Sequence, residues 1–594
     1  MTTGALLPQA MLDELAADPT LGSGNCLHYA FAANPKRDSE FIWLDHEVRA
    51  FSETYTSLSL SSLKSVVDRY AAWYSEAGVV PRDLVAVYVG NNFTNPIHFF
   101  ALTGLGAIPV LINGNMDAEI AALFIEKMGA IGLFADDEHY RAIEGHLRPG
   151  ERWLFQVTDT TVSEPSSPLP SWYPYVHSAE DPTLICHSSG TTGIPKGIIN
   201  LHQQFFYGPR HCIKSPPESR LTGLASRLGD ELSLRVPQRG MSAYPHSHSA
   251  GISFLTRAVL TGVPIMIVAD QRPKNVLRLI GEFAPTTFGA FSELYAKLSQ
   301  YDLTQYQLSS VQTWLNTGDT AHEAHIRPLV NVGSHVEGDR LVPGSTFVDR
   351  LGSSEMGFAM LKKEYSKDDT SYDRCVGTPF DFIDAQVLGE HGEIFGDNQV
   401  GMLGFRSPTI TPGYWNDSEK TYLAQRAGYW MTGDVGYRDE AGLFYHLDRA
   451  VDVIHTRNGN VYTLPTEERI QKACPDIADV TVIGVDAREQ NGGAGHSEPV
   501  AIIWAEDGEI LHVEALLNAS NLALQSDMPG HGLSAMIVVE CGDVPFGATG
   551  KVIKRELRTR YRRFLADPGV RASLARDFAI ATPAGRRVAE VVAV

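Results

Sequence analysis

Short, almost wholly apolar segments recur through the first 180 residues and alternate with segments that carry apolar residues at helical spacing. Leu84–Val89 and Ala130–Ala135 are apolar runs of the kind that form strands buried on both faces. Ser62–Glu76 has the helical spacing, and Gly78 follows it as a stop signal. Strands separated by helices favour an α/β body with a mostly parallel sheet, because parallel neighbours need a crossover connection.

The pattern continues beyond this region and then changes. Pro182–Cys186 and Gly262–Ala269 are further candidates for buried strands. Ser215–Gln238 is rich in glycine and proline, so we expect an irregular surface insertion there. Short strands with turns follow Gly401, and after Asp448 a new alternation of strands and helices begins. A composition that is 43% hydrophobic and 20% charged supplies enough apolar material for packed cores.

The change after Asp448 predicts a second, smaller domain. Val480–Val485 and Pro499–Trp504 are expected to be strands, with helices between and after them. We therefore expect a large N-terminal body with mostly parallel sheets, a smaller α+β C-terminal domain and a terminal tail. The expected bounds are residues 1–448 for the body, 449–575 for the C-terminal domain and 576–594 for the tail.

The charge balance excludes some classes of partner. Lys and Arg number 49 and Asp and Glu 70, so the formal net charge is −21. A long nucleic-acid backbone needs a positive surface, so no nucleic-acid partner is expected. The N-terminus lacks a signal-peptide pattern, and the apolar stretch Phe99–Ile112 is too short to span a bilayer. We expect a cytoplasmic protein without a membrane span, and the oligomeric state stays open.

A strand candidate runs directly into a segment rich in glycine and hydroxyl groups, His187–Ile198 (HSSGTTGIPKGI). Glycines allow a backbone to approach an anion closely, and successive N–H groups with serine and threonine hydroxyls can cradle phosphate oxygens. Lys196 adds a point charge. The segment is not a Walker A loop, and Gly550-Lys551 is followed by Val552, which has no hydroxyl for magnesium. The sequence thus predicts a phosphate-binding loop of another kind.

This loop and six later segments, in the same order, resemble the motifs of the adenylate-forming superfamily, the AMP-dependent synthetase and ligase family. Members include acyl-CoA ligases, luciferases and the adenylation domains of peptide synthetases. The resemblance runs from His187 to Lys551, most of the chain. The six later segments are Tyr244–Gly251 (YPHSHSAG), Asn316–Thr320 (NTGDT), Leu351–Gly357 (LGSSEMG), Tyr429–Gly436 (YWMTGDVG), Asp448–Asp452 (DRAVD) and Pro545–Lys551 (PFGATGK).

The resemblance implies roles for individual residues. Lys551 would bridge the acid and the α-phosphate of ATP, His248 would line the acid pocket, and Glu355 with Thr191 would hold Mg²⁺. The implied nucleotide-binding residues are Ser188, Ser189, Gly190, Thr191, Thr192, Gly193, Lys196, Gly318, Asp319, Leu351, Gly352, Ser353, Ser354, Asp434 and Arg449. The implied substrate pocket draws on Tyr244, His246, His248, Asn316 and Gly318.

The resemblance implies an AMP-forming ligase that uses ATP and Mg²⁺. It would activate a small acid as an acyl-adenylate with release of pyrophosphate, and then pass it to an acceptor, most simply CoA. Mg²⁺ and a lysine can neutralise the charge that develops when an oxyanion attacks the α-phosphate. Tyr244 and His246 favour an aryl acid over a long aliphatic chain. The family also implies a mobile C-terminal domain that rotates after adenylation.

Three positions depart from the family pattern. Leu351 stands where an aromatic residue usually stacks on the base, and Val451 takes the place of a polar hinge residue. The turn Arg457–Asn460 keeps only one of two usual glycines, in a loop that lines the pantetheine tunnel of CoA ligases. Both a thiol and an amine acceptor therefore remain open. The alternative function is that of an ATP-dependent diazotase, which activates nitrite and passes it to an aromatic amine without CoA.

Several single features have further interpretations. His246 and His248 could form a metal pair, but no third ligand is near in sequence. Ser249 lacks the first glycine of a nucleophile elbow. Lys551–Arg563 is expected to be an amphipathic helix with a solvated basic face, or else a site for the phosphates of CoA or for an acidic carrier protein. A nucleotide-binding protein without catalysis is disfavoured because the residues assigned to catalysis are all present.

Overall fold

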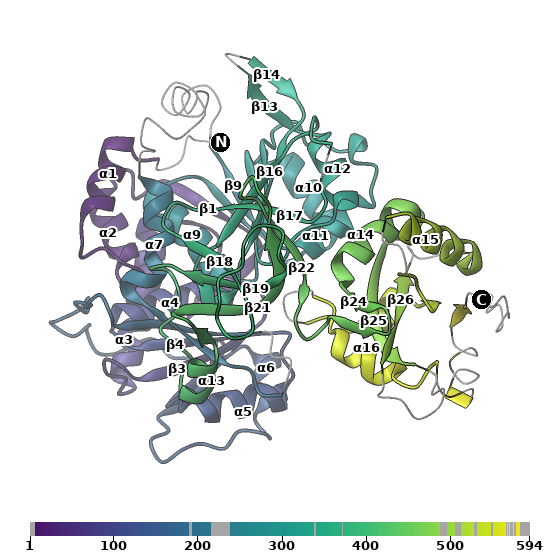
Figure 1. Cartoon of the computed structure of the whole chain (residues 1–594). Coiled ribbons are helices and arrows are strands. Elements are labelled where there is room, and N and C mark those ends of the chain that lie inside the picture. Colours follow the sequence, from purple (N-terminus) through teal and green to yellow (C-terminus); the bar gives the residue numbers. More distant parts are fainter. Residues whose placement is uncertain are drawn as a thin grey trace.

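The chain forms a large body and, beside it, a smaller C-terminal part, drawn in green to yellow in Figure 1, which shows the computed structural model. The described residues are 6–188, 193–214, 238–337, 340–370, 372–487, 496–504, 512–527, 531–547, 551–565, 567, 569–570, 574 and 578–582.

One sheet of the body has six strands and is built from consecutive crossover units. Its strands are β3 (Leu84–Val89), β4 (Ile108–Asn113), β5 (Gly132–Ala135), β6 (Phe155–Thr158), β7 (Pro182–His187) and β8 (Gly197–Leu201). The order β6-β5-β3-β4-β7 is parallel throughout, and β8 pairs antiparallel with β7. The helices before and between these strands are α3 (Leu60–Glu76), α4 (Thr94–Gly104), α5 (Ala118–Met128) and α6 (Asp137–Ile143). Every residue of β3 and β4 is buried, as expected for apolar strands covered on both faces.

The second sheet of the body has 14 strands among the described residues. They are β1 (Glu40–Ala50), β2 (Glu53–Ser59), β9 (Gly240–Ser242), β10 (Ile265–Ile267), β11 (Thr287–Ala290), β12 (Thr313–Asn316), β15 (Thr346–Leu351), β16 (Leu361–Tyr365), β17 (Cys375–Pro379), β18 (Asp384–Leu388), β19 (Gly401–Arg406), β20 (Gln425–Arg426), β21 (Tyr429–Arg438) and β22 (Phe444–Arg449). The run β15-β12-β11-β9-β10-β1 is parallel, and the remaining pairs are antiparallel.

The body contains further α-helices. They are α1 (Gln9–Ala17), α2 (Cys26–Ala33), α7 (His202–Ile213), α9 (Ser249–Thr261), α10 (Pro273–Phe283), α11 (Ser292–Ser299), α12 (Glu323–Val330) and α13 (Ser418–Leu423). A hairpin of β13 (Ser334–Glu337) and β14 (Arg340–Pro343) projects from the top of the body in Figure 1. No helix in the described part of the chain is long and apolar enough to cross a membrane.

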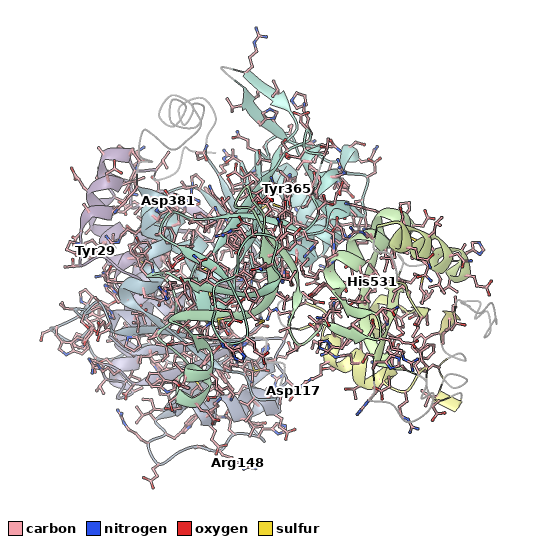
Figure 2. All side chains as sticks on the ribbon, in the orientation of Figure 1. Tyr29, Asp117, Arg148, Tyr365, Asp381 and His531 are labelled. Atoms are coloured by element: carbon pink, nitrogen blue, oxygen red, sulfur yellow. The ribbon has the colours of Figure 1, made fainter. Side chains whose placement is uncertain are left out.

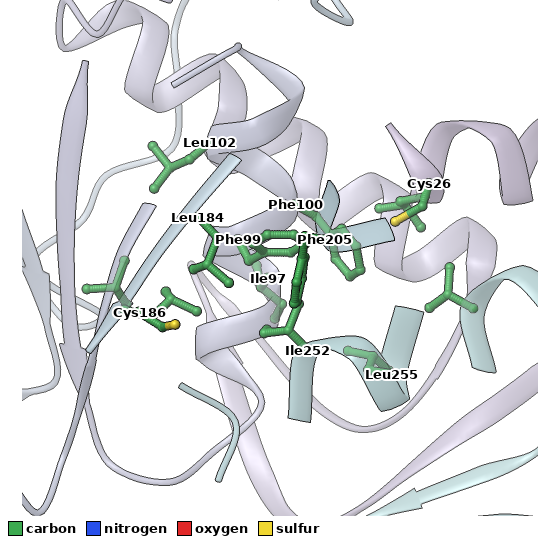
Figure 3. Close-up of a cluster of buried hydrophobic side chains, with 14 of the residues drawn as sticks. Cys26, Ile97, Phe99, Phe100, Leu102, Leu184, Cys186, Phe205, Ile252 and Leu255 are labelled. Carbon is green, nitrogen blue, oxygen red and sulfur yellow. The ribbon is translucent and has the colours of Figure 1, made fainter. Parts of the chain in front are cut away.

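The main core joins the two sheets through the helices between them. Figure 3 shows Phe99 of α4, Phe205 of α7 and Ile252 of α9 converging near Leu184 of β7. All four side chains are almost completely excluded from solvent. Burying one such side chain contributes roughly 1.5–3 kcal/mol, so this cluster fixes the two sheets relative to each other.

The C-terminal part has apolar cores of its own. Its elements are β23 (Ile454–Thr456), β24 (Gly459–Val461), α14 (Thr463–Ala473), β25 (Asp479–Asp486), β26 (Ser497–Trp504), α15 (Val513–Asp527), β27 (Ala535–Val538), α16 (Lys554–Tyr561) and β28 (Ala579–Ala581). The strands β25-β26-β27-β28 form one sheet, with a separate apolar cluster on each face. In Figure 2, His531 marks this part, whereas Tyr365 marks the core of the body.

The structure confirms the α/β class, and most expected elements lie where the sequence placed them. The strand Leu84–Val89 is β3 itself. The helix expected at Ser62–Glu76 begins two residues earlier, because Ser59 caps it. The Ser62 N–H donates to the Ser59 hydroxyl at 3.1 Å, and the Ser59 N–H donates to the Ser62 hydroxyl at 2.8 Å.

The strand expected after Gly262 is shorter than predicted, and the expected insertion cannot be compared with the structure. The strand expected at Gly262–Ala269 is only β10, because Gly262 ends α9 in the left-handed conformation with φ of +68°. The insertion expected at Ser215–Gln238 lies almost wholly outside the described residues. The basic segment Lys551–Arg563 does contain a helix, α16, and Leu557 and Tyr561 point into the core as its amphipathic pattern predicted.

Candidate active site

A cavity of about 530 Å³ lies where the carboxyl ends of neighbouring parallel strands meet. β9, β11, β12 and β15 of the larger sheet each end at a segment that lines this cavity, and so does β7 of the smaller sheet. Open α/β sheets bind ligands outside the carboxyl ends of their strands. The lining residues that follow these strands include Ser188, Tyr244, His248, Phe291, Gly318, Asp319, Gly352, Ser353, Ser354 and Glu355.

Two of the lining loops are joined by backbone pairing. Gly318 and Leu351 form an isolated parallel bridge, and the Gly352 N–H donates to the Gly318 carbonyl at 3.1 Å. Gly318 has φ of +98°, a conformation that a residue with a Cβ atom would adopt only with strain. The motifs NTGDT and LGSSEMG, which lie far apart in the sequence, therefore form one wall of the cavity.

Asp349 lies buried beneath this wall. Its Oδ1 accepts a hydrogen bond from the Asn316 amide at 2.6 Å, and its Oδ2 accepts one from the Ala321 N–H at 3.2 Å. The Asn316 amide also donates to the Asp319 carbonyl at 2.6 Å. Burial raises the pKa of Asp349 to about 7. Asn316, expected in the substrate pocket, is fully buried and supports the loop instead of lining the cavity.

Lys551 reaches the cavity from the C-terminal part of the chain. Its Nζ lies 3.1 Å from Oδ2 of Asp319. Burial alone would raise the pKa of Asp319, but the charges of Lys551, His446 and Arg449 hold it well below its usual range. Lys551 and Arg449 both line the cavity, so this end of it offers two cations to an anionic ligand.

Asp434 stands behind Arg449. Its Oδ1 lies 2.9 Å from Nε of Arg449 and 3.5 Å from Nε2 of His446. Burial alone would raise the pKa of Asp434, but Arg449 and His446 lower it to about 2, so the carboxylate is ionised at neutral pH. Its own N–H donates to the hydroxyl of Thr432, which lines the cavity, at 3.1 Å.

Glu355 and Lys196 are joined through Tyr414. The Tyr414 hydroxyl donates to Oε1 of Glu355 at 3.0 Å, and Nζ of Lys196 lies 4.6 Å from the centre of the Tyr414 ring. Mg²⁺ in nucleotide sites is commonly held by one or two carboxylates together with phosphate oxygens and water. The cavity-lining Glu355 suits such a shared site, and the described residues contain no cluster of three His, Cys, Asp or Glu side chains for a metal.

His248 has both ring nitrogens engaged. Its Nδ1 accepts the Ala250 N–H at 3.1 Å and so caps α9, while its Nε2 lies 3.0 Å from the Ser354 hydroxyl. Burial, with the nearby His187 and Lys551, lowers the pKa of His248 to about 3. A neutral ring whose Nδ1 accepts carries its proton on Nε2, so His248 donates to Ser354. The geometry makes His248 a positioned donor in the cavity wall, not a metal ligand.

The other end of the cavity is aromatic. Phe291 makes edge-on contacts with Tyr244 and with His248, each at 5.2 Å between ring centres. Phe254 and Phe358 add two further rings to the lining. The Tyr244 hydroxyl donates to the Leu315 carbonyl at 2.7 Å, which turns the apolar part of the ring toward its neighbours. Rings packed edge-on in this way suit a planar aromatic ligand.

The structure brings most of the predicted residues together but not all of them. Leu351 and Asp434 lie just behind the lining, while His246 is buried with its Nδ1 2.8 Å from the Asn91 side chain. The expected role of His246 as a wall of the pocket therefore has no support in this geometry, because its neighbours turn it away from the cavity. Gly193 has φ of +106°, as a close-approach glycine would. Ser189, Gly190, Thr191 and Thr192 lie outside the described residues.

Sequence reasoning missed several lining residues, among them Phe291, Tyr414, Arg257 and Arg350. Phe291 follows β11 directly, and a position just after a buried strand could have indicated a place in the cavity wall. Arg350 lies inside β15, directly before the motif that begins at Leu351, and a charged residue at such a position could have been noticed. Tyr414 carries no local signal, because only folding brings it to Glu355.

Comparisons with known proteins find relatives along most of the chain. A family model described as AMP-binding enzyme matches residues 33–415. A 3-aminoavenalumate diazotase from a Streptomyces species is 38% identical over 92% of this chain and 97% of its own length. A 3-amino-2-hydroxy-4-methoxybenzoate diazotase from Streptomyces cremeus is 24% identical over 91% and 96% of the two chains.

More distant similarities give the same fold. A 2-succinylbenzoate–CoA ligase from a Geobacillus species is 26% identical over 76% of this chain and 83% of its own length. The solved structure of the anthranilate CoA ligase AuaEII in complex with anthranoyl-AMP superposes with a TM-score of 0.74 at 19% identity, covering 92% of this chain and 98% of that one. With a family model spanning most of the body and a relative similar along its whole length, the chain belongs to the AMP-binding enzyme family.

Proposed function

We propose that this chain is an ATP-dependent diazotase that activates nitrite and passes it to the amine of an aminoaryl acid, without CoA. The similarity to the 3-aminoavenalumate diazotase carries this proposal, because 38% identity extends over 92% of this chain. The CoA ligase relative is similar over a shorter share and at lower identity. The departure at Arg457–Asn460 also favours the diazotase, since a loop that does not line a pantetheine tunnel need not keep the glycines of CoA ligases.

The proposed reaction has two steps. A nitrite oxygen attacks the α-phosphorus of ATP, the bond to the β-phosphate oxygen breaks, and pyrophosphate leaves. The amine nitrogen then attacks the nitrosyl nitrogen of the mixed anhydride, AMP leaves, and the amine loses a proton. The resulting N-nitroso compound takes up a proton and loses water, which gives the diazonium product.

The cavity residues can be assigned to these steps. Lys551 would neutralise charge at the α-phosphate, and Asp434 with Arg449 would position the nucleotide. Mg²⁺ shared between Glu355 and phosphate oxygens would supply further neutralisation. The aromatic end around Tyr244 and Phe291 would hold the ring of the amine. We also propose that residues 449–575 move as a unit between the steps, about the exposed Val451.

A second candidate is an aryl-acid–CoA ligase. The similarity to the 2-succinylbenzoate–CoA ligase favours it, and the first step would use the same residues on a carboxylate in place of nitrite. The basic residues of α16 would then be available for the phosphates of CoA.

Pyrophosphate release separates the two candidates. We would supply MgATP with nitrite and an aminoaryl acid, with each component omitted in turn, and repeat every mixture with CoA. The proposal predicts sustained release that needs both nitrite and the amine and is unchanged by CoA. Release that needs CoA and an aryl acid, and that ignores nitrite, would instead establish the ligase.

A further inference from the structure

Arg350 is a half-buried cation in the cavity wall that the steps above do not use. It lies on β15 and lines the cavity, and its Nε is buried without a hydrogen-bond partner among the described residues. The rings of Phe358 and Phe380 lie 5.8 and 5.7 Å from its Cζ and flank the guanidinium. Ring faces stabilise a cation but leave its N–H donors unpaired.

No carboxylate of the described residues pairs with Arg350 within 4 Å, and the acidic Glu364 of β16 is a weaker electrostatic neighbour than Cys212, Tyr244 and Arg257. The acidic residues that line the cavity are Asp319 and Glu355, which contact Lys551 and Tyr414. Burial lowers the pKa of Arg350, and its strongest electrostatic neighbours in the cavity wall are Cys212, Tyr244 and another cation, Arg257. A guanidinium that faces a cavity with its Nε buried and without a hydrogen-bond partner suits a ligand that brings its own negative charge.

Successive contacts along the cavity wall lead from Arg350 to Lys551. Arg350 is an electrostatic neighbour of Tyr244, whose ring contacts Phe291. Phe291 in turn contacts His248, which is an electrostatic neighbour of Lys551. An aryl ring placed along these contacts would present one substituent to Lys551 and another, across the ring, to Arg350.

We infer that Arg350 binds the carboxylate of the aminoaryl acid and so turns its amine toward the nucleotide end of the cavity. This inference rests on the proposed diazotase function and names the group that selects the substrate. In this orientation the carboxylate is recognised and never activated, because one carboxylate cannot occupy both ends of the cavity. An acid–CoA ligase would require the opposite orientation, with the carboxylate beside Lys551.

The test compares matched substrates that differ only in charge. We would measure nitrite-dependent AMP formation with 3-amino-4-hydroxybenzoate and 3-amino-4-hydroxycinnamate, and with the primary amide of each. A charge-assisted hydrogen bond predicts that kcat/KM for the preferred acid exceeds that for its amide by roughly 10- to 100-fold. Equal kcat/KM values for each acid and its amide would overturn the inference without touching the diazotase function.

Variants assign the preference to one residue. Arg350→Gln is expected to lower kcat/KM for the acid to that of the amide, while turnover of the amide stays within about 3-fold and shows that the protein is folded. Arg350→Lys should keep part of the preference, since it keeps the charge but loses the planar fork. Arg278→Gln, an exposed arginine paired with Glu282 at 2.6 Å, is the matched control and should change nothing.

Three outcomes would contradict the assignment. If Arg350→Gln lowers turnover of acid and amide equally, the residue is structural. If only Arg257→Gln removes the preference, the carboxylate binds at that exposed neighbour. If the wild type forms no product with nitrite but makes a CoA thioester of the acid, both the inference and the proposed function fail together, and the product distinguishes this case from the other two.

Discussion

At the scale of single residues, the cations that line the cavity differ in the side chains that surround them. Lys551 is paired with Asp319 and Arg449 with Asp434, whereas Arg350 lies beside two aromatic rings and has no ion pair among the described residues. The paired cations are oriented in advance, which suits charge that develops during a reaction. Sequence motifs predicted Lys551, Arg449 and Asp434 but not Arg350, because a motif marks chemistry that a family shares and not the substrate of one member.

Lys551→Ala is expected to lower the rate of pyrophosphate release by roughly 100-fold or more, because one charge that stabilises the transition state is lost. The KM for the amine should change little, since Lys551 lies away from the aromatic end. Arg555→Ala, an exposed cation on α16, is the control and should keep full activity. Normal release from the Lys551 variant, measured by single-turnover kinetics, would show that the assignment is wrong.

At the scale of elements, the cavity depends on loops held by buried polar groups. Strands such as β3 and β7 could be predicted because they are short, mostly apolar runs. The pairing of Gly318 with Leu351 could not be predicted, since no local sequence pattern indicates which strand ends become neighbours. The contact of Asp349 with Asn316 is equally non-local, although both residues stand beside predicted motifs.

Asp349 predicts a specific dependence of stability on pH. Its pKa is raised by burial from 3.8 to about 7, so the folded state keeps a proton that the unfolded state loses. The free energy of unfolding of the wild type, relative to Asp349→Asn, should therefore fall as pH rises from about 4 to about 7, in total by about 4 kcal/mol. Chemical unfolding of both proteins across this range is the measurement, and a constant difference would contradict the burial argument.

At the scale of the whole molecule, Lys551 reaches the cavity only because the C-terminal part is docked on the body. Glu468 of α14 accepts the Glu323 N–H at 3.1 Å and lies 2.8 Å from Nδ1 of His322. Burial alone would raise the pKa of Glu468, but His322 and Arg374 lower it to about 2, so the Glu468 carboxylate is ionised at neutral pH. The separate cores could be anticipated from the change of pattern after Asp448, but this contact could not.

Glu468→Gln should weaken this docking and lower kcat for pyrophosphate release by roughly 10-fold, because a charge-assisted contact is lost. The KM for the amine should stay within about 2-fold, since the aromatic end of the cavity belongs to the body. Glu556→Gln, an exposed carboxylate on α16, is the matched control. An unchanged kcat would mean that other contacts position Lys551.

In the proposed reaction, ATP activates nitrite and not a carboxylate. The most direct measurement supplies ¹⁵N-nitrite with MgATP and an aminoaryl acid, traps the product by azo coupling, and determines its mass. We expect one ¹⁵N atom per trapped molecule, formed together with AMP and independent of CoA. A product without ¹⁵N, or a CoA thioester of the aminoaryl acid with its amine unchanged, would contradict the proposed function.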